Sequence, residues 1–161
     1  MKLVQPTVLD LGVLALDMRE DERRQWCAIT GAAEYDADLA AQNFISAPGV
    51  KFCLLDDDGR PVAAGGYIDK GFGVWQSWMV GTDVGWAKHW RTITKEVRKV
   101  MQAMFDGGAR RLETEAMEDR RAAHVWYERS LGMTREGVHP GKYADGSTAV
   151  SFGRVRNVHV E

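Results

Sequence analysis

One segment constrains the fold more than any other, because it keeps a single periodicity over the longest stretch of the chain. From Trp86 to Phe105, apolar side chains recur at steps of three and four residues, as on one face of an α-helix. This apolar face consists of Trp90, Ile93, Val97, Val100, Met101 and Met104. Much of the other face is basic, with Lys88, Arg91, Lys95, Arg98 and Lys99. The sequence therefore predicts a long amphipathic helix, ended by Gly107 and Gly108.

Shorter segments on both sides of this helix have either strand or helix patterns. Strands are expected at residues 3–4, 52–55, 61–68, 74–80, 111–116, 133–138 and 148–155. Further helices are expected at residues 7–16, 18–29, 36–45 and 120–130. The chain contains no internal repeat, linker or low-complexity tract. These elements predict one α/β domain over residues 1–161.

Charge and motif content argue against several classes of protein. Lys and Arg number 21 against 23 Asp and Glu, so the net charge of −2 does not favour nucleic-acid binding through bulk charge. Apolar runs are too short for a membrane span or a secretion signal, and Cys27 and Cys53 fit no redox or metal motif, which favours a cytoplasmic protein with reduced thiols. The chain has neither a serine-hydrolase elbow nor a P-loop. No metal site is expected from the spacing of the four histidines, His89, His124, His139 and His159.

Two stretches of the chain resemble the GNAT family, the acetyl-coenzyme A-dependent N-acetyltransferases. In that family a strand of the form L-x-L-x-V is followed by N-x-x-A-x-x-x-Y and then by a Gly-Phe pair. Here residues 112–116 read LETEA, and the following helix carries Ala123 and Tyr127 in the phase of the family pattern. Arg120 stands in place of the Asn, and Gly132 is followed by Met instead of Phe. One extra residue also separates Tyr127 from Gly132.

The resemblance implies the fold of that family. We expect a mixed, mainly antiparallel sheet that is flanked by helices and splays open beside Val80. The strand at residues 111–116 is expected to pair in the region of Met79 and Val80. The long helix is expected to cross one face of the sheet.

The family binds acetyl-coenzyme A at a loop of the form R/Q-x-x-G-x-G/A, where backbone N–H groups and the helix N-terminus hold the pyrophosphate. Residues 81–86 occupy this place and read GTDVGW. They keep Gly81 and Gly85 but lack the basic residue and the close pair of glycines. Asp83 adds a negative charge near the expected phosphates, and Trp86 is bulky where the loop normally has small residues.

The resemblance also implies a role for individual residues in transferring an acetyl group from acetyl-coenzyme A to an amine. The cofactor-binding residues would be Met79, Val80 and Gly81, along the pantetheine, with Gly85, Trp86 and Lys88 near the pyrophosphate. Glu115 would be the general base and Tyr127 the general acid, since a phenol is protonated at neutral pH. Structural interpretations stay open for both: Glu115 could lie on a solvated sheet face, and Tyr127 could simply pack beside Trp126.

The departures in the loop support a second hypothesis. The segment 78–83, WMVGTD, with the long helix after it, is similar to a phage branch of GNAT-like proteins that includes internal virion proteins of short-tailed phages. A chain of that kind would be catalytically degenerate and act in the virion or host cytoplasm through phage structural proteins. The enzyme hypothesis instead implies a small-molecule or protein amine as acceptor, and both leave a homo-oligomer open. Trp75 and Trp78 lie three apart in one strand and must face opposite sides of the sheet, so one of them could line the acceptor cleft or a subunit contact.

Overall fold

A computed structural model describes residues 1–156 of the chain, so His159 lies outside the described residues. Seven strands form one sheet in the order β1-β2-β3-β4-β5-β7-β6. The strands are β1 (Lys2–Val4), β2 (Val50–Leu55), β3 (Pro61–Asp69), β4 (Val74–Gly81), β5 (Arg111–Met117), β6 (Thr134–His139) and β7 (Ala149–Val155). Neighbouring strands are antiparallel except for β4 and β5, which are parallel. The expected mixed, mainly antiparallel sheet is therefore confirmed.

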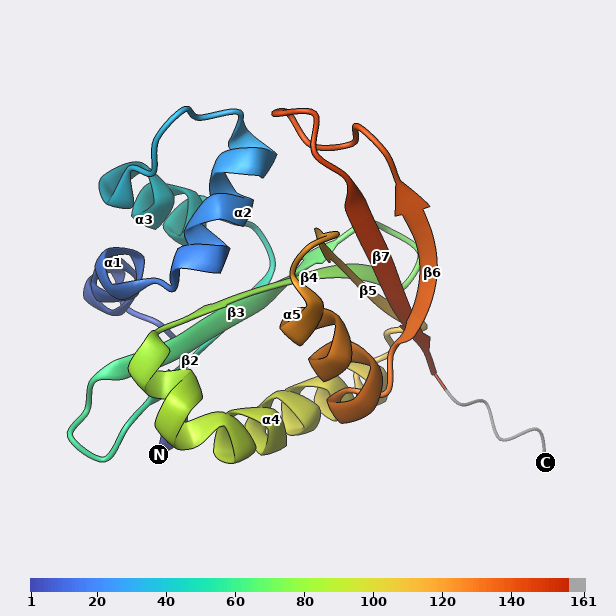
Figure 1. Cartoon of the computed structure of the whole chain (residues 1–161). Helices are drawn as coiled ribbons and strands as arrows, with labels where there is room; N and C mark the ends of the chain where they lie inside the picture. Colours follow the sequence, from blue (N-terminus) through green and yellow to red (C-terminus); the bar gives the residue numbers. More distant parts are fainter. Residues whose placement is uncertain (157–161) are drawn as a thin grey trace.

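Helices cover both faces of the sheet (Figure 1). On one face lie α1 (Val8–Asp17), α2 (Glu20–Thr30) and α3 (Ala37–Ser46), and on the other lie α4 (Asp83–Asp106) and α5 (Arg121–Val125). Each face has its own apolar core, and β4 contributes to both because its side chains alternate. Trp75 packs against the core under α4, whereas Trp78 packs against the core under α1–α3, as the spacing of the two residues predicted. Within residues 1–156 no helix combines the length and hydropathy that a membrane crossing needs.

The parallel strands β4 and β5 stay together over only three residue pairs, and then they separate. Val74, Trp75 and Gln76 pair with residues 111–113. Beyond this point β4 continues beside β3 as far as Gly81, and β5 continues beside β7 as far as Met117. The expectation that β5 would pair near Met79 and Val80 is therefore wrong, because each strand follows its antiparallel partner and leaves the other. The opening in the sheet begins before Val80 and is visible in Figure 1.

Local signals account for two differences from the expected helices. The long helix begins at Asp83 instead of Trp86, because Thr82 is its N-cap and the Thr82 hydroxyl accepts a hydrogen bond from Gly85 N–H at 2.9 Å. After α5 the chain continues as a π-helical turn, Trp126–Ser130, closed by Leu131 N–H donating to Trp126 C=O at 3.1 Å. A π-turn contains one more residue than an α-turn over the same path. It therefore absorbs the extra residue between Tyr127 and Gly132.

Candidate active site

Main-chain groups of β4 lose their neighbour where the sheet opens. In an antiparallel pair, successive residues point their N–H and C=O groups alternately toward the partner strand and away from it. Thr82 N–H donates to Val62 C=O of β3 at 3.0 Å, so the main chain of Thr82 faces β3. Because the direction alternates, the N–H and C=O groups of Gly81 and Met79 point toward the opening. Val80, between them, faces β3 with its main chain. Within residues 1–156, Met79 N–H and C=O have no hydrogen-bond partner on the open side.

Gly81 faces the same opening, but α2 already uses its polar groups. Gly81 N–H donates to Glu22 Oε2 at 2.7 Å, and Gly81 C=O accepts from Arg19 N–H at 3.2 Å. The start of α2 therefore continues the hydrogen bonding of β4 in the place where a neighbouring strand would lie. Of the outward-facing residues Met79 and Gly81, only Met79 has main-chain groups without a hydrogen-bond partner within residues 1–156.

A buried polar cluster connects the two sides of the opening. Arg120, from the segment between β5 and α5, donates to Asp21 Oδ2 at 3.0 Å and to Gln25 Oε1 at 2.8 Å, and lies 3.7 Å from Glu22 Oε1. The side chains of Arg120 and Glu22 are 7% and 5% exposed. A guanidinium with its donors in a fixed fork can hold several acceptors at once. Arg120 thereby ties α2 to the segment that carries Tyr127.

Burial raises the pKa of Glu22 to about 7, against the opposing effects of Gly81 N–H and the Arg120 charge. A carboxyl group with such a pKa exchanges protons at neutral pH, which is the property of a general base. Burial also raises the pKa of Tyr127, more than the Arg120 charge lowers it. The Tyr127 phenol is therefore protonated at neutral pH.

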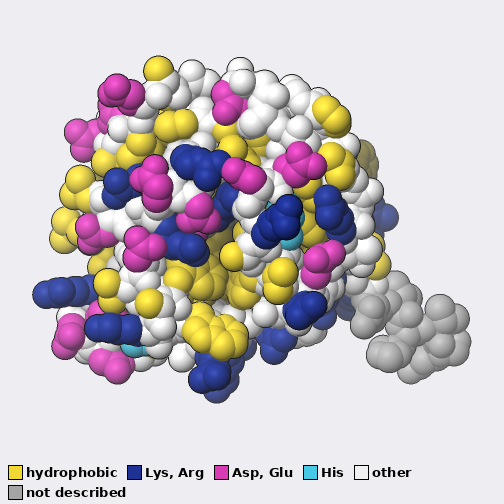
Figure 2. All heavy atoms as spheres, viewed as in Figure 1, with side chains coloured by type: hydrophobic (Ala, Val, Ile, Leu, Met, Phe, Trp, Pro, Cys, Tyr) yellow, Lys and Arg dark blue, Asp and Glu magenta, His cyan; other side chains and the backbone are white. Residues whose placement is uncertain are grey.

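Two cavities meet at the opening and share four residues in their walls: Glu22, Met79, Arg120 and Tyr127. The first, the donor-side cavity of about 190 Å³, lies between α2, α4 and the α5 segment and is otherwise lined by Arg19, Asp21, Trp86, Trp90, Ala122, Ala123 and Trp126. The second, the acceptor-side cavity of about 460 Å³, lies on the α2–α3 face. Figure 2 shows hydrophobic side chains gathered in a hollow between α2 and α4, with charged side chains around it. Two molecules that enter from opposite faces of the sheet would thus meet beside Met79 and Tyr127.

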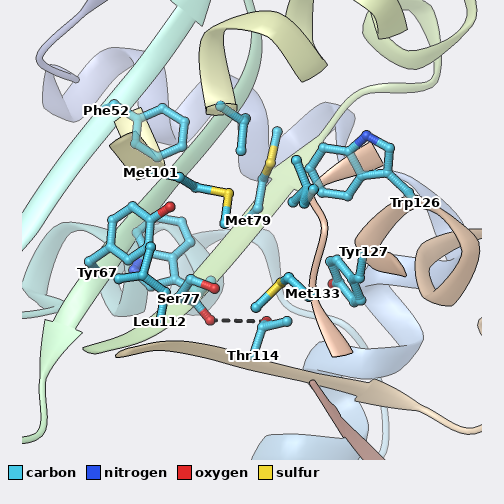
Figure 3. A pocket seen from close by; sticks show the side chains of 13 residues that line it. Phe52, Tyr67, Ser77, Met79, Met101, Leu112, Thr114, Trp126, Tyr127 and Met133 are labelled. Carbon is cyan, nitrogen blue, oxygen red and sulfur yellow. Dashed lines mark hydrogen bonds between the residues drawn. The ribbon is translucent and has the colours of Figure 1, made fainter. Parts of the chain in front are cut away.

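A smaller apolar space of about 30 Å³ lies under the opening (Figure 3). Phe52, Met101 and Met133 line it together with Met79 and Tyr127. The Thr114 hydroxyl donates to Ser77 C=O at 3.3 Å at its edge, so this polar pair is internally satisfied. The space can accept a small apolar group next to the open main chain of β4.

Of the three residues expected near the pyrophosphate, Gly85, Trp86 and Lys88, only Trp86 lines the donor-side cavity. Trp86 lines the donor-side cavity, with its ring 5.0 Å from that of Trp126 in an edge-to-face arrangement. Gly85 is buried against Val62, and its N–H is bound by the Thr82 cap. Lys88 is exposed and lines neither cavity.

A basic residue does lie close to the expected phosphate region, from another element. Arg19, at the start of α2, stands over the Trp86 ring at 5.7 Å and forms an ion pair with Asp83, Nε to Oδ1, at 3.5 Å. Arg19 Nε also lies 3.4 Å from Asp21 Oδ1, so Asp83 and Asp21 share this one guanidinium. The loop pattern alone could not show this, because Arg19 is far away in the sequence.

Glu115 lines the acceptor-side cavity together with Tyr127, so the structure brings the two expected catalytic residues to one cavity. The Glu115 carboxylate is partly buried and forms an ion pair with Lys142. Its neighbour on the strand, Thr114, lies on the opposite face of β5, among the residues of the apolar space.

Sequence reasoning missed Glu22, the carboxyl group that accepts a hydrogen bond from Gly81 N–H of β4. Glu22 stood in a run of charged residues that gave no reason to single it out. One signal was present: Glu22 precedes the buried Trp26 by one helical turn and so lies on the buried face of α2. Arg120 was visible in the sequence as a replacement for the family Asn, without an indication of its partners.

No family model matches the sequence, and no curated protein shows significant similarity to it. Comparison of the structure with solved structures does give matches. The ribosomal-protein-S18-alanine N-acetyltransferase from Escherichia coli has a TM-score of 0.71 at 16% identity, covering 99% of this chain and 96% of that chain. A spermidine N-acetyltransferase mutant from Vibrio cholerae has a TM-score of 0.71 at 9% identity, covering 96% and 95%. A GNAT superfamily phosphinothricin acetyltransferase from Sinorhizobium meliloti, in complex with AcCoA, has a TM-score of 0.66 at 12% identity, covering 96% and 87%. The fold of these acetyltransferases is also the fold of this chain.

Proposed function

We propose that this chain, which has the GNAT fold, transfers an acetyl group from acetyl-coenzyme A to an amine. The observation that carries the proposal is the unpaired main chain of Met79, which lies between two cavities that share Tyr127. A donor and an acceptor that enter from opposite faces would react at that point. The AcCoA complex of the Sinorhizobium meliloti neighbour supports the choice of donor.

On the donor side, Met79 N–H and C=O would bind the amide groups of the pantetheine in the manner of a β-strand partner. The apolar space beside Met79 and Tyr127 would take the acetyl methyl group. Trp86 forms a wall of the donor-side cavity, and beside it lies Arg19, which is ion-paired with Asp21 and Asp83. Roles for Val80, Gly81, Gly85 and Lys88 remain predictions: the main chains of Val80 and Gly81 and the N–H of Gly85 already have partners within the protein.

Transfer requires that the acceptor amine lose a proton before it attacks the thioester. Glu115 is our proposed base on the acceptor side, and Glu22, with its pKa of about 7, is a second base in the wall shared by both cavities. The amine nitrogen forms a bond to the thioester carbonyl carbon, the C–S bond breaks, and the sulfur takes a proton from Tyr127. The nitrogen also releases its second proton to solvent, so the products are the N-acetylated amine, coenzyme A and one proton, and the proton on the base returns to Tyr127 through solvent.

We place the reaction in the cytoplasm, because Cys27 and Cys53 are both free thiols. The rival hypothesis of a degenerate phage module is not favoured, since the neighbours described above are acetyltransferases.

Release of coenzyme A thiol from acetyl-coenzyme A, measured with a panel of primary amines, tests the proposal. We expect amine-dependent release that falls about 100-fold or more in Tyr127→Phe, because the phenol proton is lost while the ring remains. Tyr35→Phe is the matched control: its hydroxyl donates to Ala15 C=O at 2.6 Å, outside both cavities, and the rate should not change. Absence of thiol release with every amine would contradict the proposal, as would an unchanged rate in Tyr127→Phe.

A further inference from the structure

The acceptor-side cavity has an aromatic wall. Trp26 and Phe44 are buried, and Phe44 is stacked on Trp78 with ring centroids 5.3 Å apart and an interplanar angle of 8°. Ile29, which is 52% exposed, and Ile68 extend this apolar surface. The volume of about 460 Å³ is that of a small-molecule site.

Several polar groups in the same wall are already used by the protein, but within residues 1–156 the buried indole N–H groups of Trp26 and Trp78 have no hydrogen-bond partner. Gln25 binds Arg120 and Met117 N–H, the Thr30 hydroxyl donates to Trp26 C=O, and the Ser77 hydroxyl donates to Glu113 C=O. Groups that are satisfied in this way do not select a polar ligand. Selection of a ligand therefore depends on the apolar surface, on the charged groups and on the indole N–H groups of Trp26 and Trp78.

Only two carboxylates belong to the wall as the structure describes it, Glu22 and Glu115, and both lie toward the opening in the sheet. Glu22 is hydrogen-bonded to Gly81 and lies 3.7 Å from the guanidinium of Arg120, which belongs to the same wall, and Glu115 is paired with Lys142. At the other end, the exposed residues Asn43 and Lys70 mark the mouth toward solvent. A ligand with several ammonium groups would find no row of carboxylates here, and it would place one cation near Lys70.

We infer, on the basis of the proposed function, that the acceptor is a monoamine that carries one primary amino group and an aromatic or branched apolar group. The apolar group contacts Trp26, Phe44 and Trp78, and the single ammonium group lies at the inner end beside Glu22, Glu115 and Tyr127. Ring-to-ring contact and a cation near the aromatic faces both stabilise such a ligand. Polyamines are excluded as preferred acceptors by the same arrangement.

Direct binding in the absence of acetyl-coenzyme A tests the inference, with 2-phenylethylamine, 2-phenylethanol and spermidine as probes in calorimetric titrations. We expect 2-phenylethylamine to bind at least tenfold more tightly than its neutral counterpart 2-phenylethanol and than spermidine. In Phe44→Leu, which keeps an apolar side chain but removes the stacked ring, affinity for 2-phenylethylamine should fall about fivefold. Leu39→Ala, on the same helix but outside the cavity wall, should bind like the parent protein.

Equal or tighter binding of spermidine would overturn the inference, and so would equal affinity of the amine and the alcohol. Ile29→Ala, at the exposed edge of the wall, provides a second variant in case Phe44→Leu does not fold; an unchanged affinity there also counts against the inference. The experiments distinguish a failure of the proposed acetyl transfer from a failure of the inferred acceptor class. Thiol release with spermidine alone would support acetyl transfer and overturn the acceptor class, whereas the expected binding order without any thiol release would contradict acetyl transfer alone.

Discussion

Glu22 is a carboxyl group in a nearly dry position, where it faces Gly81 N–H and the Arg120 guanidinium. Its pKa in the folded protein, about 7, lies above the ordinary value of 4.5. Between these two values the folded state holds a proton that the unfolded state has lost, so the free energy of unfolding falls as the pH rises. The contribution is complete below pH 4.5 and is lost as the pH rises to about 7.

The substitution Glu22→Gln should remove this pH dependence. Gln keeps an oxygen that can accept from Gly81 N–H, but it cannot titrate. We expect the free energy of unfolding of the parent protein to fall by about 3 kcal/mol relative to the variant between pH 4.5 and pH 8, with little further change above it. Urea unfolding at a series of pH values measures the difference, and parallel curves for the two proteins would contradict the account.

The sequence allowed Tyr127 and Glu115 to be predicted as site candidates, because both lie in a stretch whose periodicity and motif are local. Glu22 could not be found in that way. Its importance comes from its contact with Gly81, and that contact exists only when α2 has packed along the open edge of β4. The role of Arg120 likewise depends on partners in α2.

At the scale of the elements, α4 is held at its start by the cap at Thr82. The Thr82 hydroxyl, which is buried, accepts from Gly85 N–H at 2.9 Å, and Gly85 packs against Val62 of β3. Losing the cap would leave a buried N–H without a partner at the point where the helix joins the site.

Thr82→Ala should therefore reduce the free energy of unfolding by about 1–2 kcal/mol, while Thr82→Ser should recover most of the loss. Thr134, which is exposed at the start of β6, supplies the control: Thr134→Ala should change stability by less than about 0.5 kcal/mol. Urea unfolding followed by circular dichroism gives the three values. Equal stability of Thr82→Ala and the parent would show that the cap does not hold the helix.

The elements themselves could be predicted closely, whereas their pairing could not. The 3.6-residue period made α4 visible in the sequence, and Gly107 and Gly108 marked its end. β5 pairs with residues 74–76 of β4 and not with Met79 and Val80. Where the two strands separate depends on their antiparallel neighbours, and the local sequence of β4 or β5 does not show this point. The only sign of the π-helical turn in the sequence was the extra residue between Tyr127 and Gly132, relative to the family pattern.

At the scale of the whole molecule, the sheet separates two cores and leaves one passage between them. Helices α1–α3 and helix α4 cover opposite faces, and the cavities on the two faces meet at the end of β4. In the proposed reaction, this arrangement would let the donor and the acceptor approach each other from opposite faces of the sheet. The fold thus explains why the open main chain of Met79, more than any single side chain, is the centre of the proposed site.

Titration calorimetry with acetyl-coenzyme A, applied to the parent protein, Met79→Leu and Met79→Pro, tests this account most directly. Leucine keeps the main-chain N–H, whereas proline removes it at a position where β3 does not use it, so both variants should fold, as their melting temperatures will show. We predict one site of micromolar affinity in the parent protein, the same affinity in Met79→Leu, and binding at least about tenfold weaker in folded Met79→Pro. Millimolar or absent binding by the parent protein, or equal binding by the folded proline variant, would contradict the proposed site.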